Sequence, residues 1–350
     1  MIYDERDTVF SKLMLKNMKD DSKIKKMASI LEDNKNVEDD VYACDLIVKQ
    51  YKKVSEDLHN EALNMKINSK KTNIKIEKAT NLIKEFVRLS GIDQIGITKV
   101  EKEDLYTNRG FNKNNFEYGD KVEHKFNYAI VFAVPIELDY INRAPSKELF
   151  MGAMLAYAKG SEVAARLAMY IKSLGYDAIT DCHISYESPI SFLGEKAGLG
   201  QMGRCNAVVN PKYGNRTKFA AVHTNLPLNL DKQLDFGLHE FCELCRRCEN
   251  NCPSKAISHD CSYDENNKKY WKHDEIACFK VWKSTGFSCG VCMSACPFSQ
   301  GVDENLVSKM KDNKEIMIEI IKQHQKKYGK RNHIQKPLNF MPNTNNKRCK

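Results

Sequence analysis

The sequence predicts an α+β protein, a layered α/β core followed by a separate metal-binding half. Three observations predict this class. Helical and strand patterns alternate over residues 74–228. Glycines are dense in the last part of this range, residues 197–228, and eight of the thirteen cysteines fall within residues 241–297. Alternating elements of this kind bury their apolar faces in layers. A chain of 350 residues with 42% hydrophobic content is long enough for two or three domains.

The first part of the chain is charged and reads as helical. Residues 1–73 lack glycine and carry short apolar patches at helical spacing. We expect a helical N-terminal extension that packs on the body and takes no part in catalysis. Residues 74–89 then show the pattern of an amphipathic helix, for which Gly91 is a natural C-terminal cap.

The core elements follow. Short β-branched runs predict strands at residues 95–100, 128–136 and 176–180. A long helical pattern covers residues 146–174, and Gly160 within it predicts a split into two helices.

A glycine-rich stretch covers residues 197–228 and contains two further strand patterns, at 206–210 and 218–224. Glycines at this density let the backbone approach a large flat ligand closely. A nucleotide site is not indicated, because no G-x-G-x-x-G opens a helix after a strand. The residues therefore predict a ligand site directly upstream of the cysteines.

The cysteines follow the bacterial ferredoxin run, C-x2-C-x2-C-x3-C-P, whose fourth cysteine ligates the other cluster. We expect two 4Fe–4S clusters in a ferredoxin-like domain over residues 236–301, with crossed ligand sets. The first set is Cys242, Cys245, Cys248 and Cys296, and the second is Cys252, Cys278, Cys289 and Cys292.

Zinc and disulfides are the alternatives for these cysteines. Zinc sites also use C-x2-C pairs, but the C-x3-C-P ending has no role in a zinc ribbon. Disulfides need an oxidising compartment, which nothing in the chain indicates. The five other cysteines lack ligand spacing and are expected to be plain thiols. They are Cys44, Cys182, Cys205, Cys261 and Cys349.

Charge and hydropathy restrict partners and location. Residues 302–350, a basic C-terminal tail, carry twelve Lys and Arg against five Asp and Glu, which leaves the body of the +9 chain near neutrality. Global basicity is therefore a poor argument for nucleic acid. The N-terminus has no signal pattern, and no apolar run reaches the ~18 residues of a membrane span. We expect a cytoplasmic protein.

The order of motifs resembles the reductive dehalogenase family. The chain reads AGLG-x2-GR, N-P-x-YG, TNLPL and D-FG-x3-FC before the first cysteine run. W-x6-C-x3-W-x6-C-x2-C-x3-CPF completes the second run. The resemblance covers about residues 74–299. That family is related to epoxyqueuosine reductase, and the segment Y-A-K-G-S-E at 157–162 is similar to one in that reductase. The twin-arginine signal of respiratory dehalogenases and the fused flavin reductase module of one subgroup are missing.

The resemblance implies a corrinoid (cobalamin) beside the two clusters, in a nitroreductase-like core over residues 74–235. Electrons would pass through the clusters to cobalt, for reductive cleavage of a carbon–halogen or similar bond in a small molecule. An external donor, ferredoxin or flavodoxin, would supply them. Eight residues of the glycine-rich stretch are expected to bind the corrinoid. They are Gly198, Gly200, Gly203, Arg204, Asn210, Tyr213, His223 and Thr224.

The family uses a tyrosine acid with a cationic neighbour, which points to Tyr157 and Lys218. A nearby ammonium would stabilise the phenolate left after proton donation. Glu162 is the competing acid under the epoxyqueuosine reductase pattern, and residues five apart on one helix do not share a face. His223 is a third option and is not expected to ligate cobalt. A packed tyrosine and a solvated lysine are the plainer interpretations of Tyr157 and Lys218.

Two other functions stay open. One is reduction of a tRNA epoxide with the same cofactors, which the basic tail favours slightly through phosphate attraction. The other is an electron-transfer protein that holds the clusters without a corrinoid.

Overall fold

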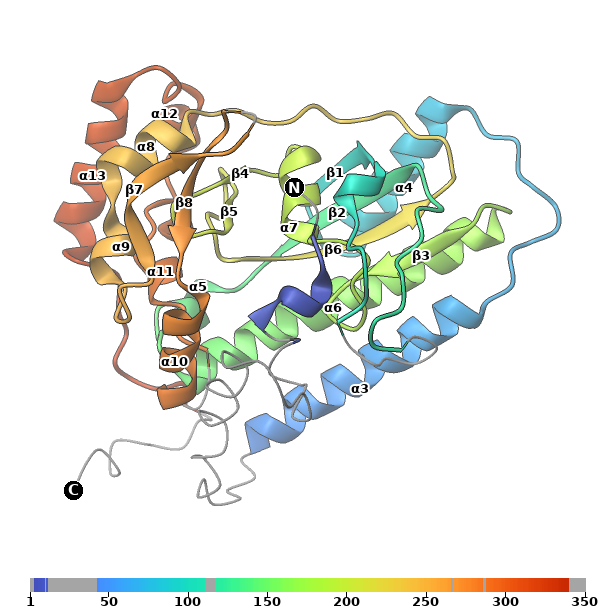
Figure 1. Ribbon diagram of the computed structural model, residues 1–350, viewed down its shortest axis with the longest axis horizontal. Coiled ribbons are helices and arrows are strands. Elements are labelled where there is room, and N and C mark those ends of the chain that lie inside the picture. Colours follow the sequence, from blue (N-terminus) through green and yellow to red (C-terminus); the bar gives the residue numbers. More distant parts are fainter. Residues whose placement is uncertain are drawn as a thin grey trace.

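A four-stranded sheet forms the centre of the fold in the computed structural model (Figure 1), which describes residues 3–9, 11, 43–110, 117–265, 267–285 and 288–339, without the side chains of 43–45. In spatial order the strands are β1 (Gln94–Lys99), β2 (Tyr128–Pro135), β6 (Thr217–Thr224) and β3 (Ala178–Asp181), and every neighbouring pair is antiparallel. Mixed helix and strand content is confirmed. The antiparallel pairing makes the fold α+β, because parallel strands would mark an α/β fold.

Helices cover both faces of the sheet. Alternate residues of β2 and β6, such as Phe132 and Val222, pack against α4 (Ile76–Leu89) and α6 (Lys147–Ser173). The intervening residues, such as Val131 and Ala221, pack on the other side against α7 (Ile190–Lys196). The central strands are apolar on both faces, which is why they read as continuous hydrophobic runs.

α6 is one continuous helix of 27 residues, so the predicted split at Gly160 is wrong. Gly160 has a packing role instead. A Cβ atom there would lie 3.1 Å from the Cβ of Ala220, so glycine lets the helix approach β6 closely. α3 (Ala43–Asn64) lies alongside α6 (Figure 1). Residues 12–42 of the predicted extension lie outside the described residues.

Short elements build the cysteine-rich half, at the end of the molecule opposite α4 (Figure 1). They are α8 (Leu238–Cys245), α9 (Arg247–Asn251), β7 (Ile257–Tyr263), β8 (Lys269–His273), α10 (Glu275–Thr285), α11 (Val291–Ser294) and η3 (Phe298–Gln300). Further short elements precede this half in the chain. They are η1 (Glu5–Asp7), η2 (Lys102–Asp104), α5 (Leu138–Ile141), β4 (Gln201–Met202) and β5 (Val208–Val209).

The basic tail begins with structured elements. α12 (Glu304–Ser308) and α13 (Lys314–Tyr328) follow the last cysteine, and their apolar residues share a core with α8. Met317 and Ile320 of α13 pack in this core with Phe241. The division of the chain at residues 73, 235 and 301 stays a prediction.

Within the described part of the chain, no helix combines the length and the apolar character needed to cross a bilayer.

Candidate functional site

Two short helices set the positions of the first three cluster cysteines. α8 carries Cys242 and Cys245, and α9 carries Cys248. Arg246 stands between the helices with a φ of 52°, a left-handed conformation that ends α8. The chain therefore changes direction between Cys245 and Cys248, and all three side chains line one small cavity.

The first cradle is the set of four thiols from the two cysteine runs that line this cavity. Its members are Cys242, Cys245, Cys248 and Cys296. Burial raises the pKa of Cys296 to about 12, and negative charge on Cys205 and Cys245 contributes to the rise. Cys296 thus lies beside thiols of the first cysteine run, as a crossed ligand set requires.

The second cradle is the remaining set of thiols, Cys252, Cys278, Cys289 and Cys292. Burial raises the pKa of Cys278 to about 11, and negative charge on Cys289 and Cys252 adds to the rise. Burial also raises the pKa of Cys292, to which Cys205 and then the other three thiols of the cradle contribute. Cys252 belongs to the first run but lies with the thiols of the second run. This position also supports the crossed pairing.

The cradles suit iron–sulfur clusters better than zinc. Among the residues that the structure describes, no three His, Cys, Asp or Glu side chains converge on a point where one metal ion could bind. A cluster needs thiolates spaced around it, because each one binds a different iron. The buried thiols would lose their protons when iron binds, since metal coordination deprotonates thiols.

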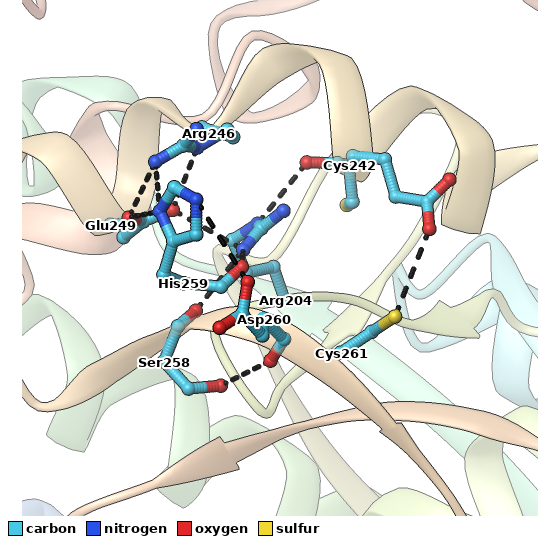
Figure 2. Close-up of polar contacts among 9 residues, drawn as sticks. Arg204, Cys242, Arg246, Glu249, Ser258, His259, Asp260 and Cys261 are labelled. Atoms are coloured by element: carbon cyan, nitrogen blue, oxygen red, sulfur yellow. Dashed lines mark hydrogen bonds and ion pairs between the residues drawn. The ribbon is translucent and has the colours of Figure 1, made fainter.

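Arg204 joins the glycine-rich stretch to the first cradle, and Figure 2 shows its guanidinium within a ring of polar partners. It donates hydrogen bonds to three backbone carbonyls, those of Cys242 (3.1 Å), Ser258 (3.1 Å) and His259 (2.6 Å). Arg204 also pairs with Glu249 at 3.2 Å, and its guanidinium carbon lies 4.8 Å from the centre of the Trp271 ring. These contacts give Arg204 a structural role between the two halves.

A cavity of 1090 Å³ lies where α3, α6 and β6 meet the second cradle. Its walls are largely apolar, with side chains such as Phe150, Ile184 and Phe219. Cys292 of the second cradle also lines it. The second cradle is therefore the one next to the large cavity.

Tyr157, Lys218 and His183 come together in this cavity. Lys218 Nζ lies 4.6 Å from the centre of the Tyr157 ring, and the His183 ring lies 5.1 Å from it, centre to centre. Ser161, one turn along α6 from Tyr157, lies with its Oγ 2.8 Å from His183 Nδ1. A phenol held beside an ammonium and an imidazole can deliver a proton to a bound molecule.

None of the eight residues predicted to bind a corrinoid lines the large cavity. Their chain neighbours do, among them Met202, Asn206, Ala207, Asn215 and Thr217. The glycines allow close backbone packing. Gly198 has a φ of 79°, and a Cβ there would lie 2.3 Å from the Lys232 carbonyl oxygen. Gly200 and Gly203 pack in the same way against Val209.

The polar members of this predicted set hold the scaffold. The Asn210 amide donates to the Leu199 carbonyl at 2.7 Å, and the Tyr213 hydroxyl donates to Asp93 at 2.9 Å. His223 is buried with its Nε2 2.8 Å from an Asp181 carboxylate oxygen. Thr224 Oγ1 donates to the Asp177 carbonyl at 2.7 Å. In this structure His223 thus faces a carboxylate within the protein.

Glu162, the alternative acid, does not line the cavity. Its carboxylate lies 3.9 Å from Arg166 Nη2, one turn further along α6. Because α6 does not break at Gly160, Tyr157 and Glu162 point to different sides of the helix. The geometry therefore brings Tyr157 and Lys218 together and leaves Glu162 apart.

The sequence patterns missed several cavity residues. Tyr106, Tyr186 and Ser188 line the cavity, and burial raises the pKa of both tyrosine phenols. Residues of α3, such as Lys52 and Asn60, line it too, although no catalytic part was expected for the extension. None of these residues belongs to a motif, so only the fold reveals them.

The remaining cysteines outside the two runs differ in setting. Cys182 and Cys205 are buried, whereas Cys261 is partly exposed. Cys349 and the side chain of Cys44 lie outside the described residues.

Comparisons with known proteins agree with this geometry. Residues 241–300 match the family model of a 4Fe-4S dicluster domain. A tetrachloroethene reductive dehalogenase from Sulfurospirillum multivorans is 30% identical over 254 residues, 63% of this chain and 50% of that protein. A second, from Desulfitobacterium hafniense, is 28% identical over 64% of this chain and 48% of its own length. The chain is related to the reductive dehalogenases.

A solved structure shows a similar fold. The structure of a catabolic reductive dehalogenase in complex with 3-bromo-4-hydroxybenzoic acid matches 82% of this chain and 42% of its own, with a TM-score of 0.70 and 24% identity. This likeness shows the fold. A more distant relative is an epoxyqueuosine reductase from Lactococcus garvieae, 24% identical over 45% of this chain and 44% of that protein. The resemblance drawn from the motif order is thereby confirmed.

The chain spans about half the length of the curated dehalogenases that it matches. Their activity therefore reaches this chain only as a proposal.

Proposed function

We propose that this protein is a corrinoid-dependent iron–sulfur oxidoreductase of the reductive dehalogenase type. The observation that carries the proposal is the large cavity, which is bordered at once by Cys292 of the second cradle and by the Tyr157–Lys218 pair. The proposed cluster site and the proposed proton donor thus border one cavity. We also propose that the sheet and its helices form a nitroreductase-like core.

The cavity fits a corrinoid in size and character. Its volume of 1090 Å³ is at the upper end of ligand pockets, about 300–1,000 Å³, and its walls are mostly apolar. A bound corrinoid would supply a strongly reducing and nucleophilic cobalt centre. Met202, Asn206, Ala207 and Asn215, beside the scaffold glycines, are the residues of the glycine-rich stretch that would contact it.

The side chains of this chain would then bind and protonate the substrate. Tyr157 would give its phenolic proton to the carbon or oxygen from which a group departs, and the Lys218 ammonium would stabilise the phenolate. Apolar walls such as Ile184 and Phe219 favour an apolar small molecule.

Electrons would enter from an external ferredoxin or flavodoxin. The first cradle would receive them and the second would pass them on, because Cys292 borders the cavity while no thiol of the first cradle does.

The two alternative functions fit less well. The epoxide-reducing route needs Glu162 as the acid, but this residue pairs with Arg166 outside the cavity. A plain electron carrier has no use for a cavity of this size next to its cluster site.

Anaerobic reconstitution tests the proposal. Protein loaded with iron, sulfide and cobalamin should retain one corrinoid per chain after gel filtration, with a corrinoid absorption spectrum. With reduced flavodoxin it should release halide from chlorinated ethenes or bromophenols. Cluster absorption without retained corrinoid would overturn the enzyme proposal, and turnover of epoxyqueuosine tRNA without halide release would favour the alternative.

A further inference from the structure

Cys205 is a fifth thiol in the first cradle. It belongs to neither cysteine run and lies on the loop between β4 and β5, 9% exposed. It lines the small cavity together with the four thiols of the first cradle. Its side chain contacts Cys248, and it also packs with Cys252 of the second cradle. Cys205 therefore lies between the two cluster sites.

The Cys205 sulfur is held by a hydrogen-bond donor. Asn215 Nδ2 donates to Cys205 Sγ at 2.9 Å. The Asn215 amide is itself oriented, because its Oδ1 accepts a hydrogen bond from Ser299 Oγ at 2.7 Å. Cluster-binding thiolates are tuned by hydrogen bonds to their sulfurs, whereas a thiol that only fills space in a core needs none.

We propose that Cys205 is a reserve ligand of the first cluster, able to bind iron in place of Cys248. The inference rests on the proposed cluster sites and not on the corrinoid. In the exchange, the bond from iron to Cys248 Sγ breaks and a bond from iron to Cys205 Sγ forms. The Cys205 proton moves to Cys248, and no electron is transferred. The pre-oriented Asn215 amide would stabilise the Cys205 thiolate once it binds iron.

The proposal is tested in the full-length protein reconstituted without corrinoid. The measurements are iron and acid-labile sulfide per chain and the electron paramagnetic resonance signals of the reduced clusters. Cys248→Ala should keep both clusters. The double variant Cys205→Ala/Cys248→Ala should lose the first cluster and about half of the iron. Cys182→Ala/Cys248→Ala is the matched control, since Cys182 is a buried thiol away from both cradles, and it should behave as Cys248→Ala does.

Two outcomes would overturn the proposal. One is that Cys248→Ala loses the first cluster as fully as Cys245→Ala, which has no spare thiol beside it. The other is that the double variant keeps as much iron as Cys248→Ala. Retention of the second cluster signal shows that each variant has folded.

A second measurement leaves Cys248 unchanged, so it tests the proposal even if the Cys248 variants fail to fold. Under mild oxidant, the first cluster of Cys205→Ala should decay faster than that of the unmodified protein, by about tenfold. Cys182→Ala should decay at the unmodified rate. Equal rates of cluster decay in all three proteins would also overturn the proposal, whether or not the protein releases halide.

Discussion

The two cradles differ in what surrounds them. The first is built into an apolar core, in which Phe241, Phe298 and Met317 pack around its thiols. The second lies at the edge of the large cavity, and α10, which carries Cys278, has no buried residue among those described. The comparison teaches that the chain itself encloses the first cluster site. The second borders the cavity through Cys292, whereas its Cys252 and Cys289 are buried within the chain.

Removing one crossing cysteine gives the largest expected effect on this comparison. Cys296→Ala should remove the first cluster and Cys252→Ala the second, so iron falls from about eight to about four per chain in each case. Iron analysis and the spectrum of the surviving cluster distinguish the two. If Cys296→Ala removed the cluster next to the cavity instead, the crossed pairing would be wrong.

Tyr157→Phe tests the cavity side of the comparison. The change removes the proposed proton donor but keeps the ring beside Lys218, so halide release should fall by about 10²–10⁴-fold. Cluster and corrinoid content should stay unchanged. Glu162→Gln is the matched control on the same helix and should turn over normally. Normal turnover of Tyr157→Phe would assign the proton to another group, and His183 is the nearest candidate.

Arg204→Leu tests the surroundings of the first cradle. The guanidinium is 3% exposed, and its loss leaves three backbone carbonyls without their donor. The free energy of unfolding should fall by about 3 kcal/mol, as for other broken buried ion pairs. Chemical denaturation under anaerobic conditions measures it. Arg246→Ala, which removes a more exposed partner of Glu249, should cost much less. Equal losses would mean that Arg204 does not join the two halves.

His324 on α13 gives the smallest predicted effect, a pH dependence. Burial, and secondarily the nearby Arg247, lowers its pKa to about 4, and neither ring nitrogen has a hydrogen-bond partner among the described residues. The unfolded chain binds the proton more readily, with a pKa of about 6.5. Stability from this residue is therefore complete above about pH 6.5 and decreases towards pH 4, by about 1–2 kcal/mol at pH 5.

His324→Phe should remove this difference in the free energy of unfolding between pH 7 and pH 5, when both proteins are measured side by side. A variant that loses stability as steeply as the unmodified protein would show that His324 is not the titrating group.

Much of the core could be predicted from the sequence because its signals are local. β1, β2, β3 and β6 each begin and end within two residues of a predicted strand, since each is a short apolar run between polar turns. The cysteine runs carry their meaning in their spacing. The predicted split of the helix at Gly160 was wrong because a glycine in a helix can mark either a break or a close contact. Only the position of Ala220 decides between the two.

The cavity was harder to predict because its residues are brought together by the fold. Tyr157 and Lys218 were found through family resemblance, but Tyr106, His183 and Lys52 belong to no motif. Residues of the glycine-rich stretch do line the cavity, but they are not the eight that were predicted to bind a corrinoid. The glycines of the stretch serve backbone packing, and the side chains between them form the wall.

The cavity wall also has a consequence for biosynthesis. Glu5 and Met293 both line it, so its sides come from parts of the chain almost 300 residues apart. A ribosome makes α3 and α6 long before it makes Cys292. Until that last segment emerges and docks, the cavity lacks the wall that Cys292 and Met293 provide. The cavity is thus completed late in the synthesis of the chain.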